Sequence, residues 1–214
     1  GRGRRVTRAI LETRPQPQRP RLVEAAVKDA ESGVIVASDG LLYGTFGDGI
    51  TTRDMVYSLG QDGTAYRIVS DLQNGVRPTG TLIEGRDGVL YGTTERGGNF
   101  DGGTVFRVER NGSGFAQIVQ LEGHPVVGVT EAPGPGGNLY LYGVEADGAS
   151  AATQFGTVFR LRHDGTSFQQ TGLFTGSDRD GATPKSPLLL GRDGQLYGTA
   201  SDSGGCPFST CGTV

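Results

Sequence analysis

"GRDGVLYGTTERGGNFDGGTVFRV", residues 85–108, returns in pieces further along the 214-residue chain. Its first half recurs as "GRDGQLYGTASDSGG" at residues 191–205, and its end recurs as "FGTVFRL" at residues 155–161. Such recurrence is typical of proteins in which one small unit stacks on copies of itself. Glycine makes up 38 of the 214 residues and hydrophobic residues only 35%, which favours several thin layers joined by tight turns over one thick core.

Four copies of the signature "DGxLYGT" align along the chain, the third degraded to "GGNLYLYGV". Their tyrosines follow one another at intervals of 48, 51 and 55 residues, in the order Tyr43, Tyr91, Tyr142 and Tyr197. A second phrase, "GTVFRV" or "GTVFRL", is followed by Asp-Gly or Asn-Gly at constant spacing. The copies differ in length mainly between the two phrases, so we predict a rigid unit that carries one variable loop.

The repeats divide the chain into a single repeat domain, residues 21–214, and a basic, proline-rich tail or partial strand, residues 1–20. We expect repeat units at residues 21–77, 78–124, 125–183 and 184–214, the last of them truncated. Two arrangements are open. The units form part of a larger open array cut from a longer protein, which we favour, or a four-blade ring closes by pairing residues 6–12 with the last strand.

Four short extended segments are expected in each unit. In the second unit they are residues 81–85, 89–94, 103–109 and 115–121, all rich in β-branched and aromatic residues. Asp-Gly and Asn-Gly pairs separate them, as tight hairpin turns require. Four strands in a unit of roughly 50 residues are typical of a propeller blade. The sequence therefore predicts an all-β, β-propeller-like array of four-stranded antiparallel blades, with about 3.5 to 4 repeats.

The signature residues are interpreted as structural. An Asp before Gly orders its own turn by accepting nearby backbone amides, and a tyrosine within "LYG" packs between sheets or, alternatively, stacks on a sugar. The glycine after each tyrosine allows strands or blades to approach closely. This set comprises Asp39, Gly40, Tyr43, Gly44, Asp87, Gly88, Tyr91, Gly92, Tyr142, Gly143, Asp193, Gly194, Tyr197 and Gly198.

Charge and hydropathy argue against two classes of partner. The net charge is −3, and the seven arginines of residues 1–21 lack interleaved aromatic residues, so we expect a solvated tail and no nucleic-acid partner. No apolar run is long enough to span a membrane.

Few residues are candidates for a catalytic, redox or metal-binding role. Cys206 and Cys211 flank a short loop segment, and we predict a disulfide between them rather than a redox pair or half of a metal site. His124 and His163 occupy different repeat positions in turns, without a nucleophile motif. Asp178-x-Asp-Gly begins like a calcium loop but lacks the closing glutamate. We therefore predict no catalytic residue, no metal site and no cofactor.

The combined pattern of "DGxLYGT", a glycine-rich variable loop, "GTVFRV" and "GATPKSPLLLGRDG" resembles the tandem GloVer repeats of large bacterial proteins, of the choice-of-anchor kind. The resemblance covers residues 78–214 well and residues 39–77 moderately. It implies an exported, propeller-like protein at the cell surface or outside the cell, often tethered by a separate anchor. It brings no catalytic residues.

These observations favour a non-enzymatic extracellular or cell-surface scaffold that binds a glycan or a protein through its variable loops. Residues 46–54, 95–102, 145–155 and 200–211 form these loops. Two alternatives stay open. One is a polysaccharide-degrading enzyme on a propeller scaffold, marked by a deep pocket with convergent acids. The other is an architectural array that self-associates through its open terminal blades.

Overall fold

The computed structural model describes residues 32–47, 54–73, 75–125, 127–148, 154–177 and 181–202. Within these ranges the protein is almost entirely β-strand, with one short 3-10 helix, η1 (Pro135–Gly137). None of the described helical segments is long and apolar enough to cross a membrane. The predicted all-β class is confirmed.

Three antiparallel sheets of four strands each form complete blades. Blade A contains β1 (Ile35–Val36), β2 (Leu42–Phe46), β3 (Met55–Leu59) and β4 (Arg67–Asp71). Blade B contains β6 (Ile83–Glu84), β7 (Leu90–Thr94), β9 (Thr104–Val108) and β10 (Ala116–Gln120). Blade C contains β11 (Thr130–Pro133), β12 (Leu139–Glu145), β13 (Thr157–Leu161) and β14 (Gln169–Leu173). In each blade the strands pair in chain order, so the four-stranded units predicted from the repeats are observed.

A fourth unit, blade D, is represented by the hairpin of β16 (Leu189–Leu190) and β17 (Leu196–Tyr197). Two smaller ladders join neighbouring units: β5 (Gly75–Val76) pairs with β8 (Arg96–Gly97), and β15 (Ala182–Pro184) pairs with β18 (Ala200–Asp202). Because each of these ladders begins just after one blade ends, they tie the connecting segments to the next blade.

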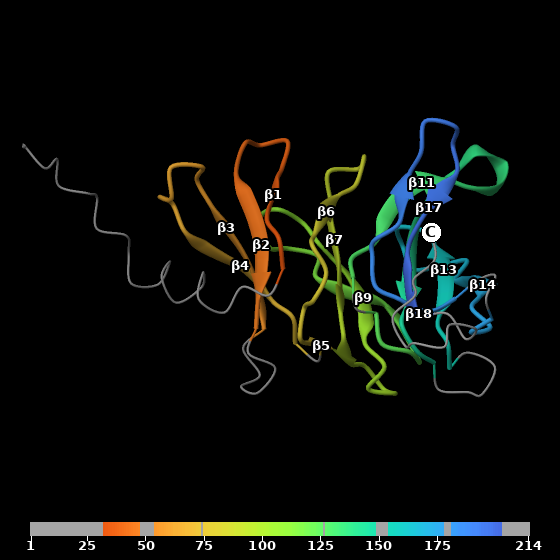
Figure 1. Cartoon of the computed structure of the whole chain (residues 1–214). Helices are drawn as coiled ribbons and strands as arrows, with labels where there is room; N and C mark the ends of the chain where they lie inside the picture. The colour runs from red at the N-terminus through yellow and green to blue at the C-terminus, as the bar shows by residue number, and fades with distance from the viewer. Residues whose placement is uncertain are drawn as a thin grey trace, which may run out of the picture.

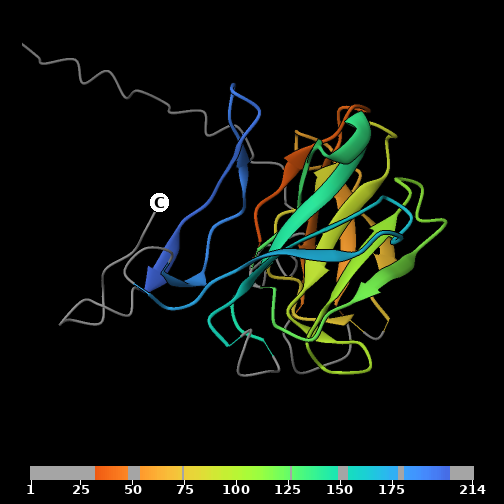
Figure 2. The same ribbon diagram turned by 90° about the vertical axis from the view of Figure 1, so that its right-hand side faces the viewer.

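Blades A, B and C stack face to face in that order (Figure 1), and Leu188, Leu190 and Leu196 of blade D pack against a buried cluster of blade C. Viewed from the side, the three complete blades lie one behind another (Figure 2). Tyr43 of blade A is buried in one cluster with Leu90 and Phe106 of blade B. Tyr91 of blade B is buried in a second cluster with Leu141 and Phe159 of blade C. The core is therefore a series of thin apolar layers, and the β-propeller-like array follows from repeated burial of one face on the next.

Each hairpin turn is built around its glycine. Gly40, Gly88 and Gly194 have φ between 78 and 81°, a region that residues with a Cβ rarely adopt. In blade B the amide of Gly85 donates to the carbonyl of Val89, and the amide of Gly88 donates to the carbonyl of Gly85. The loop is therefore longer than a two-residue turn, and only the glycine of each Asp-Gly pair needs positive φ.

The glycine after each signature tyrosine forms a slot for an aromatic ring. Gly92 lies opposite Phe106 across the β7–β9 ladder, and a Cβ added to Gly92 would lie 2.5 Å from Cζ of Phe106. Gly143 has the same relation to Phe159 at 2.3 Å, and Gly44 lies opposite Tyr57. The glycine of each "YG" phrase therefore leaves the space that the ring of the "VF" phrase occupies on the neighbouring strand.

The third unit departs from the others because its first hairpin is longer. Thr130 pairs with Tyr142 and the ladder continues to Pro133 and Leu139, whereas the same hairpin in blade B stops at Glu84 and Leu90. The turn is displaced outward, so Asn138 does not stand where Asp87 stands. Tyr142 and Gly143 keep the strand register of Tyr91 and Gly92, but Tyr142 donates instead to the carbonyl of Pro133.

Among the described residues, no strand of blade A pairs with a strand of blade D. In Figure 1 blade A lies at one side of the molecule, and the hairpin of blade D overlaps blade C. The tail at residues 1–20, Cys206, Cys211 and Asp178 lie outside the described residues, as do both strands invoked for ring closure.

Candidate functional site

The signature aspartate and tyrosine form one repeated hydrogen-bonded unit. The hydroxyl of Tyr91 donates to Oδ2 of Asp87 at 2.7 Å, and the amide of Val89 donates to Oδ1 of Asp87 at 3.1 Å. The same two bonds, at the same distances, join Asp39 to Tyr43 and Leu41, and Asp193 to Tyr197 and Gln195. One carboxylate therefore fixes both the turn and the tyrosine ring, which gives these residues a structural role.

Burial and the neighbouring carboxylate both raise the pKa values of the hydrogen-bonded signature tyrosines. Burial, followed by the hydrogen bond to Asp39, raises the pKa of Tyr43 to about 12. Burial and Asp87 likewise raise the pKa of Tyr91 above its ordinary range. For exposed Tyr197 the bond to Asp193 is the main cause of a raised pKa. Tyr43, Tyr91 and Tyr197 therefore donate these hydrogen bonds in their neutral form at physiological pH.

Signature tyrosines that donate the same hydrogen bond differ in how deeply they are buried. Tyr91 is 0% exposed and Tyr197 is 48% exposed, because the described residues place no blade on the outer face of blade D. Packing between sheets therefore describes Tyr43, Tyr91 and Tyr142, but not Tyr197.

We expect Tyr91→Phe to lower the free energy of unfolding by about 1 kcal/mol, the usual net value of a hydrogen bond shielded from water. Tyr197→Phe is the matched control and should cost less than half as much, because water can replace its bond. Urea denaturation of both variants measures the difference. Equal losses would contradict the role given to burial.

A glutamate on the first strand of a blade clamps it to the preceding blade. Glu131 of blade C accepts the backbone amide of Arg86 in blade B at 3.0 Å, and its Oε1 lies 2.8 Å from Nε2 of His163. Glu84 of blade B likewise accepts the amide and hydroxyl of Ser38 in blade A, at 2.6 and 2.8 Å. Arg110 of blade B lies 3.1 Å from Glu84 and has the turn position of His163. His163 is therefore part of a structural clamp.

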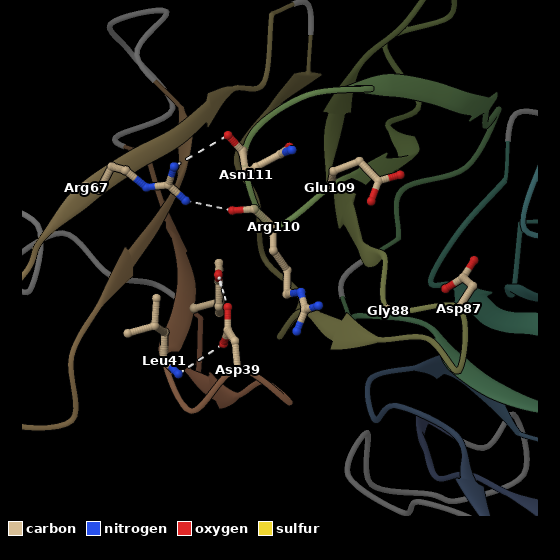
Figure 3. A pocket seen from close by; sticks show the side chains of 9 residues that line it. Asp39, Leu41, Arg67, Asp87, Gly88, Glu109, Arg110 and Asn111 are labelled. Carbon is tan, nitrogen blue, oxygen red and sulfur yellow. Dashed lines mark hydrogen bonds between the residues drawn. The ribbon is translucent and has the colours of Figure 1, made fainter.

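A hollow between blades lies at the hairpin end of blades A and B and has a volume of about 440 Å³ (Figure 3). Several of its charged groups already have partners within the protein. Arg67 donates to the carbonyls of Arg110 and Asn111, and Asp39 holds Tyr43. Leu41, Asp87, Gly88 and Glu109 complete the lining. We interpret this hollow as the open side of the contact that Glu84 makes between blades A and B, rather than as a ligand site.

The second hollow, the loop-end cleft, lies between the outer strands of blades B and C and has a volume of about 320 Å³. Phe100, from the variable loop at residues 95–102, stands at its edge and is 65% exposed. Phe168 of blade C is also exposed. The cleft is lined by Phe100, Gln120, Glu122, Glu145, Phe168, Gln169 and Gln170. It therefore combines two exposed aromatic rings with amide and carboxylate groups, and it includes one of the predicted binding loops.

Glu145, at the base of this cleft, is a buried carboxyl group whose described hydrogen-bond partners are one hydroxyl group and two amides. Its side chain accepts bonds from the hydroxyl of Thr157, the amide of Gly123 and, at 3.4 Å, the amide of Gln170. It is 1% exposed, and burial raises its pKa. Its neighbours use both oxygens, which favours a structural role over a catalytic one.

The raised pKa of Glu145 predicts a pH-dependent gain from Glu145→Gln. A raised folded-state pKa means that native stability is fully present below the ordinary value of 4.5 and decreases as pH rises through the folded value. The variant, which cannot ionise, should therefore gain stability relative to the native protein as the pH rises above 4.5. Thermal denaturation at a series of pH values measures the gain, and Glu109→Gln, at a side chain of blade B that is 39% exposed, is the control and should show none.

His124, another candidate from the sequence, does not line this cleft. His124 contacts Asp147, whose Oδ1 accepts the His124 amide at 3.1 Å and lies 2.9 Å from its Nδ1. Across the described ranges, no group of three or more His, Cys, Asp or Glu side chains could hold a metal ion. Sequence reasoning missed the clamp glutamates and the two cleft phenylalanines. The glutamates of "LIEG" and "VTEAP" were a usable signal, because both stand on a first strand.

No protein-family model matches the sequence, and no curated protein is detectably similar to it. Among solved structures, a nidogen/laminin complex is similar with a TM-score of 0.49 and 18% identity over 74% of this chain and 51% of that chain. An α-L-arabinofuranosidase from Clostridium thermocellum is similar with a TM-score of 0.48 and 14% identity, over 83% and 64% respectively. The chain thus spans between half and two thirds of these two proteins. At this level of similarity, neither the binding nor the catalytic properties of those proteins can be assigned to this chain.

Proposed function

We propose that this chain is a non-enzymatic extracellular or cell-surface scaffold that binds a glycan in the loop-end cleft. The observation that carries the proposal is the position of Phe100, an exposed ring on a variable loop at the edge of a polar hollow. The C–H face of a sugar ring can pack on an aromatic face, while amide and carboxylate groups bond its hydroxyls. A rigid blade pair that carries a changeable loop suits recognition.

The non-enzymatic part of the proposal is supported by the state of the acids in the cleft. Glycoside hydrolysis requires two carboxyl groups that reach the substrate from either side. Glu145 is buried and bonded to Thr157, Gly123 and Gln170, which leaves Glu122 as the accessible acid of the cleft. The surface location and the relation to GloVer repeats are proposed from the spacing of the signature phrases.

A glycan array followed by titration calorimetry with the best-binding oligosaccharide tests the proposal. We expect Phe100→Ala to weaken binding at least tenfold, because it removes the exposed stacking surface. Phe155→Ala, which removes another partly exposed phenylalanine away from the cleft, should leave the dissociation constant unchanged. A blank array, or equal effects of both variants, would contradict glycan binding at this cleft. Release of reducing sugar from the bound oligosaccharide would contradict the non-enzymatic part.

A further inference from the structure

The loop that carries Phe100 is closed by backbone hydrogen bonds. Of the four variable loops predicted from the sequence, the one at residues 95–102 is described throughout. Its first part forms β8, which pairs with β5. The amide of Gly103 then donates to the carbonyl of Gly97 at 3.2 Å. Phe100 therefore lies between two residues that are bonded to each other.

Asp101 bonds the other arm of this loop. Its Oδ1 accepts the backbone amide of Gly97 at 3.0 Å, and its Oδ2 lies 3.1 Å from Nη1 of Arg96. Its φ of 53° lies in the left-handed region, which aspartate and asparagine adopt more readily than most residues with a side chain. Because Asp101 directly follows Phe100, these contacts fix the backbone that carries the ring.

A further bond reaches the loop from the outer strand of blade B. Oε1 of Gln120, at the end of β10, accepts the backbone amide of Asn99 at 2.9 Å. Phe100 thus has a bonded residue on each side, Asn99 and Asp101. Gln120 lines the loop-end cleft, whereas Asp101 does not. Asp101 is therefore the residue whose replacement changes the loop without removing a group from the wall of the cleft.

The charge of the cleft narrows the class of glycan that it suits. Glu122 and Glu145 are the charged side chains among the described residues that line it, and Glu122 is exposed. Arg96 is paired within the loop, and Arg160 donates to the side chain of Gln169. A sugar carboxylate or sulfate would therefore meet a like charge, whereas sugar hydroxyls can bond carboxylate and amide groups.

We propose that the loop-end cleft is a preformed site for uncharged sugars, in which Asp101 holds Phe100 in place and Glu122 repels anionic sugars. Asp101 is a positioning residue, because it acts on the ligand through the ring of Phe100. A ligand does not have to order a loop that is already fixed, and ordering of loops is one of the main costs of binding. This inference rests on the glycan binding proposed above.

Nuclear magnetic relaxation of the ligand-free chain tests the positioning alone. We expect the backbone amides of residues 97–101 to have order parameters of about 0.85, as rigid strands do. Asp101→Ala should lower those of Asn99 and Phe100 below about 0.6. Asp101→Asn keeps an oxygen acceptor and tolerates the same φ, so it should restore the order. The side chain of Asp101 is 63% exposed, so both variants should fold, which circular dichroism verifies.

Low order in the native loop, or equal order in the native chain and Asp101→Ala, would overturn the positioning role whether or not a glycan binds. Titration calorimetry with the neutral oligosaccharide selected by the array then measures the effect on recognition. Asp101→Ala should raise the dissociation constant about tenfold, the effect of ordering about one residue on binding. Asp101→Asn should restore most of the affinity. An unchanged dissociation constant for Asp101→Ala would show that recognition does not use the fixed loop.

The same oligosaccharide with one primary hydroxyl group oxidised to a carboxylate tests the charge. It should bind the native chain about fivefold more weakly than the neutral form, the effect of about one like-charge contact near water. Glu122→Gln should remove most of that difference, because its amide still bonds hydroxyls but carries no charge. Equal or tighter binding of the acidic form by the native chain would overturn the sugar class. A blank array would overturn glycan binding itself, so the two failures are distinguishable.

Discussion

Gly92→Ala is expected to lower the free energy of unfolding by about 3 kcal/mol, at the upper end of the usual cost of overpacking a core. The added methyl group would lie 2.5 Å from Cζ of Phe106 and 2.7 Å from Cδ2 of Leu82. Both side chains belong to the buried layer between blades A and B, so the ring cannot move away without opening that layer. Urea denaturation followed by circular dichroism measures the loss.

Two comparisons distinguish a filled slot from a general cost of replacing glycine. Gly172→Ala, on the outer strand of blade C, adds a methyl group 3.6 Å from the side chain of Val158 and should be nearly neutral. In a Phe106→Leu background the ring is absent and Leu82 is the remaining close neighbour, so Gly92→Ala should cost less than in the native chain, and the two substitutions should be coupled. Additive losses would contradict the slot.

Glu131→Ala is expected to cost about 2 kcal/mol, because the substitution removes the acceptor of a partly buried clamp. The backbone amide of Arg86 would lose its acceptor, and His163 would lose the carboxylate at 2.8 Å. Only 12% of the Glu131 side chain is exposed, so water replaces these bonds poorly. Thermal and urea denaturation should both report the loss, with little change in the content of β-strand.

The matched control is Glu109→Ala in blade B. The Glu109 side chain is 39% exposed and lies 3.7 Å from Arg107, a surface ion pair whose removal should cost less than about 0.5 kcal/mol. A loss for Glu131→Ala as small as that for Glu109→Ala would show that the clamp does not hold blades B and C together.

The strands were predictable because each signature carries several independent local signals. In blade B the expected segment at residues 89–94 is observed as β7 (Leu90–Thr94), and that at residues 103–109 as β9 (Thr104–Val108). Asp-Gly turns, β-branched runs and the "YG" slot with its "VF" ring all indicate the same pairing, so local propensity and tertiary structure agree.

The long hairpin of the third unit was not predictable from the alignment of tyrosines. Its sequence contains both Tyr140 and Tyr142, and the position of Asn138 relative to Tyr142 imitates that of Asp87 relative to Tyr91. The ladder extends to Pro133 and Leu139, which moves the turn and removes the tyrosine–carboxylate bond. Register depends on the partner strand, which one segment alone does not encode.

The loop-end cleft was predictable only in part. The variable length at residues 95–102 indicated a surface loop, and Phe100 lies on it. Gln120 and Glu145 lie on strands of two different blades, Phe168 lies just before β14, and the three share no sequence pattern. Their convergence depends on how blade B packs on blade C, and a repeat alignment contains no information about such contacts.

Nuclear Overhauser spectroscopy of the labelled protein tests the stack of blades most directly. The rings of Tyr91 in blade B and His163 in blade C have centroids 5.2 Å apart, so we expect cross-peaks between their ring protons. We also expect cross-peaks from the α protons of Gly92 to the ring of Phe106, with the glycine protons shifted upfield by that ring. Missing Tyr91–His163 cross-peaks, together with glycine protons at random-coil shifts, would contradict stacked blades that share one repeated register.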